Sequence, residues 1–186
     1  MTGNCGKYEL GSIFQLVPPA TGSGVWTYTI VYDVGGYSTP FGGLVLDRMG
    51  NFYGLTESPT TAFKLTPPAT KGGAWIESTI FRFEELPNGP LIIGTDGALY
   101  GTTLNGRELA YGTVFRLRSP KETGGAWRQD ILYTFQGQSD GASPRAGLVF
   151  DESGNLYGTT TFSGTVGVEC EGTRFRLWQR VPVGTT

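Results

Sequence analysis

The chain of 186 residues contains no histidine. This absence excludes Ser-His-Asp and Cys-His catalysis, and it excludes zinc or copper sites built on imidazole. Aspartate and glutamate are the remaining candidates for acid–base chemistry. A hydrolase of that type needs two carboxylates that face each other across a cleft.

An excess of charge and long apolar segments are lacking as well. Fourteen Lys and Arg residues stand against sixteen Asp and Glu residues, and the charges are spread singly along the chain. We therefore predict neither a nucleic-acid partner nor membrane insertion. No apolar run approaches the roughly 18 residues of a membrane-spanning helix, and the N-terminus has no charged-then-apolar signal pattern.

Helical periodicity is the third absence, and strand patterns take its place. Residues 112–160 predict four short strands, at Gly112–Leu117, Trp127–Phe135, Gly147–Phe150 and Asn155–Thr160, which we name c, d, a and b in chain order. Strands c and d alternate apolar and polar residues, as expected of half-buried strands. Strand a is apolar without alternation, which predicts a strand that is covered on both faces.

The same unit is repeated along the whole chain. Each strand d opens with a tryptophan 12 residues after the phenylalanine of strand c, and each strand b has a tyrosine 9 residues after the leucine of strand a. Four strands with a period of about 50 residues predict an all-β fold, a β-propeller-type array of four-stranded antiparallel blades with strand a nearest the axis. We expect a single repeat domain over residues 1–186, with units at about 11–60, 61–111 and 112–171 and a partial unit at 172–186. That gives about three blades, with the two ends out of phase. The repeated residues are Phe14, Phe63, Phe115 and Phe175; Trp26, Trp75 and Trp127; Leu44, Leu91 and Leu148; and Tyr53, Tyr100 and Tyr157.

The loops that vary in length predict the functional face. The d–a and b–c loops differ between units, whereas the a–b and c–d turns are constant. In an up-and-down sheet the two variable loops emerge at the same end, and loops of this kind commonly carry function. The candidate ligand-binding residues there are Tyr37, Phe41, Glu57, Asn105, Arg107, Glu108, Tyr111, Asp140, Arg145, Phe162 and Glu169.

Several of these features have simpler structural interpretations. Loop carboxylates are most often solvated charges, and the Ser139-Asp140-Gly141 segment lacks the further spaced carboxylates of a calcium loop. The three a–b turn aspartates are expected to shape their turns, and the strand-d tryptophans to serve as packing posts rather than sugar platforms. Arginines on strand c are expected to form a solvated outer stripe. We predict no metal site and no cofactor; the turn aspartates are Asp47, Asp96 and Asp151.

Two cysteines, Cys5 and Cys170, lie near the two ends of the chain. A disulfide between them and a pair of free thiols are both consistent with the sequence.

The segments GTVFRL, GGAW, LYTFQGQSDGASP and AGLVFDESGNLYGTT resemble the Gloeo/Verruco tandem-repeat family of bacterial surface proteins. The resemblance covers nearly the whole chain. It departs from the pattern at Leu86-Pro87-Asn88 and at Gly94-Thr95-Asp96. It implies a secreted or surface-anchored β-propeller-like protein, and it brings no catalytic residues.

We therefore expect a non-enzymatic extracellular or cell-surface module, which acts as a scaffold or recognises a glycan or protein through its variable-loop face. The alternative is a carboxylate-dependent hydrolase or lyase with its site at the propeller mouth. The expected partner is a second copy that completes a ring, or neighbouring repeats of a longer chain.

Overall fold

The computed structural model describes residues 11–34, 39–104, 111–122, 124–137 and 140–162, and the backbone of 174–177. Within these ranges the chain is all-β, as predicted, and contains no helix that could span a membrane. The strands are β1 (Ser12–Val17), β2 (Thr27–Asp33), β3 (Pro40–Leu46), β4 (Phe52–Thr56), β5 (Thr61–Thr66), β6 (Ile76–Arg82), β7 (Pro87–Ile93), β8 (Leu99–Thr103), β9 (Thr113–Arg118), β10 (Arg128–Thr134), β11 (Ala142–Pro144), β12 (Val149–Phe150), β13 (Leu156–Phe162) and β14 (Arg174–Leu177).

These strands form a hairpin and three antiparallel sheets. The N-terminal hairpin is β1–β2, and the first sheet has the order β3-β4-β5-β6. The second sheet is β7-β8-β9-β10, and in the third sheet β11 and β12 pair with one edge of β13 while β14 pairs with the other. The strand order a-b-c-d therefore holds in the first and second sheets, as the repeat predicted, and the third sheet follows it as a-b-c without a strand d among the described residues.

The third sheet departs from the prediction in its strand a. Ala142–Pro144, which precedes the predicted strand a at Gly147–Phe150, pairs with β13 as β11. The register also shifts within β3 and within β7 at the equivalent place. Thus β11 and β12 are the two halves of one strand a, divided by an irregularity common to all three sheets. A proline of strand a pairs with a threonine of strand b in every sheet, in the pairs Pro40–Thr56, Pro87–Thr103 and Pro144–Thr160.

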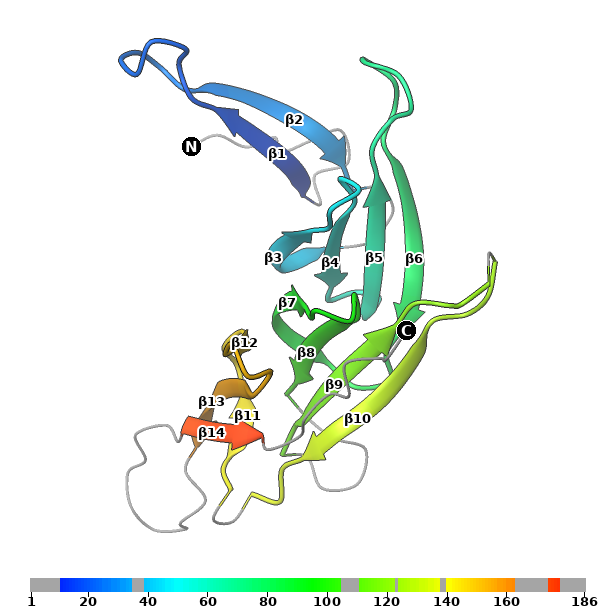
Figure 1. The fold of residues 1–186 in the computed structure, drawn as a ribbon, viewed down its shortest axis with the longest axis vertical. Helices are drawn as coiled ribbons and strands as arrows, with labels where there is room; N and C mark the ends of the chain where they lie inside the picture. The colour runs from blue at the N-terminus through cyan, green and yellow to red at the C-terminus, as the bar shows by residue number, and fades with distance from the viewer. Residues whose placement is uncertain are drawn as a thin grey trace.

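The described residues form three core clusters, and each one joins one layer to the next. The hairpin contributes Ile13 and Val34, which pack against Phe63 and Leu65 of the first sheet. The opposite face of the first sheet packs on the second sheet, and the second sheet packs on the third in the same way. Figure 1 shows the result as a stack of layers, with the hairpin and the third sheet at opposite ends.

Successive a strands approach closely along this stack. A Cβ at Gly42 would lie 3.1 Å from the carbonyl oxygen of Gly89, and a Cβ at Gly89 would lie 3.1 Å from the carbonyl oxygen of Ala146. Gly89 also has a positive φ of 73°, a backbone conformation that favours glycine. The backbones of β3, β7 and the β11–β12 strand are therefore in near contact, and β3 and β7 lie side by side in Figure 1.

The expectation that strand a is covered on both faces is wrong in the first and third sheets. Leu91 of the second sheet is 1% exposed, but its counterpart Leu44 in the first sheet is 40% exposed. Val149 of the third sheet is 60% exposed. The cause is what lies against each strand a. The second sheet's β7 lies against β3, whereas β3 faces the hairpin, which has no strand a or b among the described residues, and no described layer lies beyond the third sheet.

Candidate functional site

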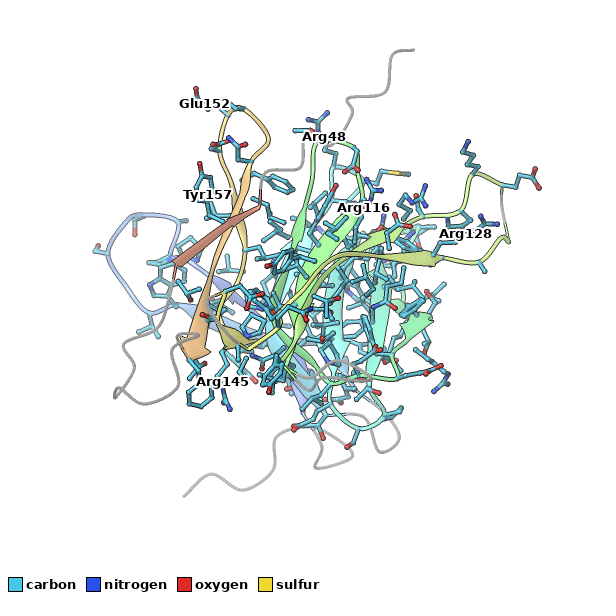
Figure 2. The ribbon with its side chains drawn as sticks, turned by 90° about the horizontal axis from the view of Figure 1, so that it is seen from below. Arg48, Arg116, Arg128, Arg145, Glu152 and Tyr157 are labelled. Atoms are coloured by element: carbon cyan, nitrogen blue, oxygen red, sulfur yellow. The ribbon has the colours of Figure 1, made fainter. Side chains whose placement is uncertain are left out.

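The two kinds of connection lie at opposite ends of the sheets. Because neighbouring strands are antiparallel, the a–b and c–d turns share one end, and the d–a and b–c loops share the other. In Figure 2, Arg48 and Glu152 of the a–b turns lie at one side of the molecule and Arg145 lies at the opposite side. We call these the turn end and the loop end.

At the loop end, Tyr111 and Asp140 contribute to loop structure. The Tyr111 carbonyl accepts a hydrogen bond from the amide of Ser143 at 2.8 Å. Asp140 Oδ2 accepts hydrogen bonds from the hydroxyl of Tyr133 and the amide of Gln136, both at 2.9 Å. The Asp140 carboxylate therefore holds the start of the d–a loop, the role that aspartate often has in turns.

The other described candidates do not form one cluster with these two. Phe41 is half-buried and packs against the core between the first and second sheets. Glu57, Arg145 and Phe162 have exposed side chains. Outside the described residues lie Tyr37, Asn105, Arg107, Glu108 and Glu169, and also Cys5 and Cys170.

At the turn end, aspartates organise the a–b turns as predicted. Asp47 Oδ1 accepts hydrogen bonds from the amides of Met49 and Asn51, both at 2.9 Å. Its Oδ2 accepts from the Asn51 side chain at 2.7 Å and from the hydroxyl of Tyr53 at 3.0 Å. Asp151 receives the same four hydrogen bonds in the third sheet, from Ser153, Asn155 and Tyr157.

In the second sheet the turn carboxylate that binds the strand-b tyrosine comes from a different position. Gly94 stands where the other turns have aspartate, and the carboxylate comes instead from Asp96, two residues later. Asp96 Oδ2 accepts a hydrogen bond from the Tyr100 hydroxyl at 2.9 Å, and its Oδ1 accepts from the Ala98 amide at 3.1 Å. Each strand-b tyrosine is therefore tied to a carboxylate of its own turn.

These contacts set the ionisation of the turn residues. Partial burial acts to raise the pKa of Asp47, but the hydrogen bonds from Asn51, Tyr53 and Met49 outweigh it and lower the pKa. The side-chain hydrogen bond from Asn155 lowers the pKa of Asp151. Burial, together with the hydrogen bond to Asp96, raises the pKa of Tyr100 to about 12. Asp47 and Asp151 are consequently held ionised near neutral pH and are poor general acids.

An arginine–aspartate network lies on the same end of the second sheet. Arg116 and Arg118 both contact Asp130 at 2.8 Å, and Arg116 Nη1 lies 3.8 Å from Asp96. The expected solvated arginine stripe is therefore wrong for Arg116, whose side chain is largely covered and paired. Nothing among the described residues groups three Cys, Asp or Glu side chains in a way that could hold a metal ion.

A groove opens between the first and second sheets at the turn end. It has a volume of about 590 Å³, within the range of small-ligand sites. Trp127 and Tyr53 form an aromatic wall, with ring centroids 6.0 Å apart and an edge-on geometry. Asp47, Arg48, Thr95 and Ser119 add polar groups to the lining, and the exposed Leu46 and Met49 add apolar ones.

The prediction that the strand-d tryptophans are packing posts holds for Trp75 and Trp127, which pack against core clusters, and is wrong for Trp26. Trp75 packs against Phe52 at 5.5 Å, Trp127 lines the groove beside Tyr53, and Trp26 is exposed on the hairpin. The identical spacing gave no sign of this difference, because Trp127 meets Tyr53 of the preceding sheet whereas Trp75 meets Phe52 of its own sheet.

No protein-family model matches the chain, and no curated protein matches it, so its function has to be inferred from the groove, the loop end and the exposed faces themselves.

Proposed function

We propose that the chain is a non-enzymatic recognition module of the β-propeller type, which works outside the cell or at its surface and binds a glycan. The groove between the first and second sheets carries this proposal. The face of a sugar ring packs well on an aromatic wall such as Trp127, and its hydroxyl groups need polar partners such as Arg48 and Ser119 at the rim.

The propeller-type arrangement is supported by the repeated layer geometry. Two successive sheets have the strand order a-b-c-d, the third continues it as a-b-c, and their a strands approach backbone to backbone. A radial array with strand a innermost has both properties. The extracellular location is supported by the resemblance to bacterial surface repeats.

The loop end is a second surface for the same kind of function, with protein as the ligand. Tyr111 and Phe162 are large, exposed apolar side chains there, and Arg145 is exposed at the same end. Aromatic residues and arginine are enriched at protein interfaces.

A carboxylate-dependent hydrolase or lyase has weaker support. Asp47, Asp96, Asp151 and Asp140 are all engaged in hydrogen bonds that shape turns and loops. A general acid needs a raised pKa, and the pKa values of Asp47 and Asp151 are lowered.

The proposal is tested by screening the protein on an immobilised glycan array, followed by calorimetry with the best binder. Trp127→Ala should weaken binding about tenfold or more, as expected when an aromatic anchor is removed. Trp75→Ala is the matched control, because Trp75 has the same repeat position but packs against Phe52. Circular dichroism verifies that both variants fold. An array without any binder, or equal losses for the two variants, would contradict the glycan proposal.

A further inference from the structure

The N-terminal hairpin exposes a face that the other layers bury. Phe14 of β1 is 56% exposed, whereas its counterparts Phe63 and Phe115 are 2% and 0% exposed. Leu16 is exposed as well, while the equivalent Leu65 and Leu117 are buried. In the first and second sheets a strand b lies against strand c, but among the described strands β1 pairs with β2 alone.

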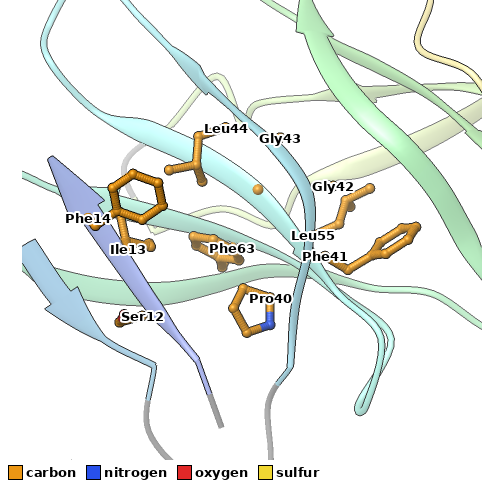
Figure 3. Close-up of a pocket in the computed structure, with 11 residues that line it drawn as sticks. Ser12, Ile13, Phe14, Pro40, Phe41, Gly42, Gly43, Leu44, Leu55 and Phe63 are labelled. Carbon is orange, nitrogen blue, oxygen red and sulfur yellow. The ribbon is translucent and has the colours of Figure 1, made fainter. Parts of the chain in front are cut away.

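A cavity lies beside this free edge. It has a volume of about 370 Å³, and it is bounded by β1 on one side and by β3 with the strands behind it on the other. Figure 3 shows Phe14 and Ile13 on one side of it and Pro40 and Leu44 on the other. The corresponding space between the first and second sheets is filled by Tyr53 and Leu55 of a strand b. The cavity therefore has the position of an absent strand a and strand b.

The third sheet exposes the matching strands. Tyr157 of β13 is half-buried and Thr159 is exposed, while the equivalent Tyr100 and Thr102 of the second sheet are buried. Val149, which pairs with Tyr157, is exposed too. This exposed face is formed by a strand a and a strand b, the two strands that are missing beside β1.

The register of the strands agrees with this match. Strand b places a glycine opposite the phenylalanine of strand c in all three sheets, in the pairs Gly54–Phe63, Gly101–Phe115 and Gly158–Phe175. With Phe14 opposite Gly158, Leu16 would lie opposite Leu156 and Gln15 opposite Tyr157. Phe14 and Leu16 would then extend the core in which Leu148 and Leu156 already pack on the second sheet.

We propose that a second copy of this chain seats its β11–β13 strands in the cavity beside Phe41 and pairs its β13 with β1. The hairpin takes the place of β14 on β13 and adds β2 as strand d. Thirteen hairpin residues thus replace the four of β14 (6 in β1 plus 7 in β2). The hairpin and the third sheet lie at opposite ends of the stack in Figure 1, so the partner is a second molecule. Two copies joined in this way at both ends give six four-stranded sheets, within the range of closed propellers, and two-fold symmetry.

Light scattering coupled to size exclusion, at concentrations up to about 100 μM, tests the assembly. We expect twice the mass of the chain. Phe14→Asp should raise the dissociation constant at least about 30-fold, because a charge cannot enter the new core. Val25→Asp is the control, since Val25 is 89% exposed on the same hairpin but lies beyond β1 and β2. A monomer at all concentrations overturns the proposal, and so does a dimer that Phe14→Asp leaves unchanged.

A mixing experiment identifies the occupant. In a background with Cys5→Ser and Cys170→Ser, one batch carries Gln15→Cys and another carries Tyr157→Cys. The proposed register predicts a disulfide-linked dimer that forms readily only when the two batches are mixed. If both substitutions in one chain instead give a linked monomer and no linked dimer, the hairpin binds its own third sheet and the second-copy proposal is wrong.

Discussion

The contact between Gly101 and Phe115 can be tested by a double-mutant cycle. Phe115 is fully buried, its ring lies 5.0 Å from that of Phe83, and it covers the backbone of Gly101 on the neighbouring strand. A Cβ added at Gly101 would lie 2.7 Å from Phe115 Cζ and 3.1 Å from Leu91 Cδ2. The two positions are therefore coupled directly through space.

The magnitudes follow from packing. Phe115→Ala should destabilise the protein by about 3–5 kcal/mol, the usual cost of removing a buried aromatic ring. Gly101→Ala should cost about 1–3 kcal/mol, because the methyl group overfills a close-packed site. In the Phe115→Ala background the methyl group has room, and alanine is the better residue in a strand by about 0.5–1 kcal/mol. The interaction energy of the cycle should therefore be at least about 1.5 kcal/mol.

Urea denaturation followed by tryptophan fluorescence provides the four free energies of unfolding. The m-values of the four proteins should agree, so that differences in midpoint report stability. Additive effects would refute the packing argument, because they would mean that the methyl group does not meet the ring. A loss below about 1 kcal/mol for Phe115→Ala would refute the burial of the ring.

Three further predictions concern the turns and the stack of a strands. Gly89→Ala should cost more than Gly154→Ala in urea denaturation, because both glycines have positive φ but only Gly89 faces backbone atoms of the next sheet. Asp47→Ala should cost about 1–2 kcal/mol. It should also weaken the loss of stability on acidification, because a carboxylate with a lowered pKa stabilises the fold above the unfolded value and ceases to do so as the pH falls through the folded value. Tyr100 should titrate at about 12 in absorbance at 295 nm, and because its pKa is raised, the stability it contributes should decline as the pH rises from about 10 towards that value. Tyr100→Phe should remove that titration step. Equal costs for the two glycine variants would contradict the close approach of the a strands. An unchanged acid profile for Asp47→Ala, or a Tyr100 that titrates near 10, would contradict the hydrogen bonds of the turns.

The sequence predicted the sheets better than it predicted the surfaces. The spacing of Phe115, Trp127, Leu148 and Tyr157 was sufficient for the strand order, because those residues recur at fixed intervals within one unit. The exposure of Phe14 could not be predicted in this way. Its local sequence matches that of Phe115, and the difference arises from the strands that lie against it.

The candidate site shows the same limit. Trp127 lines a groove because Tyr53 and Met49 come from the preceding sheet, a contact that no spacing within a unit encodes. The departure at Gly94-Thr95-Asp96 concealed a conserved geometry, since Asp96 reaches Tyr100 from a shifted position. A comparison of carboxylate–tyrosine distances, rather than of aligned letters, would have found it.

The chain of core clusters has a consequence for how the protein opens. Each cluster couples one layer to its neighbour, so cooperativity is short-ranged and approximates a sum of nearest-neighbour terms. In the single chain, fraying should begin at the hairpin, where β1 and β2 have one covered face, and it should reach β8 and β9 last. The rate of amide hydrogen exchange would then fall stepwise from the ends of the stack to its centre. In this respect the protein would behave as a short one-dimensional lattice of layers.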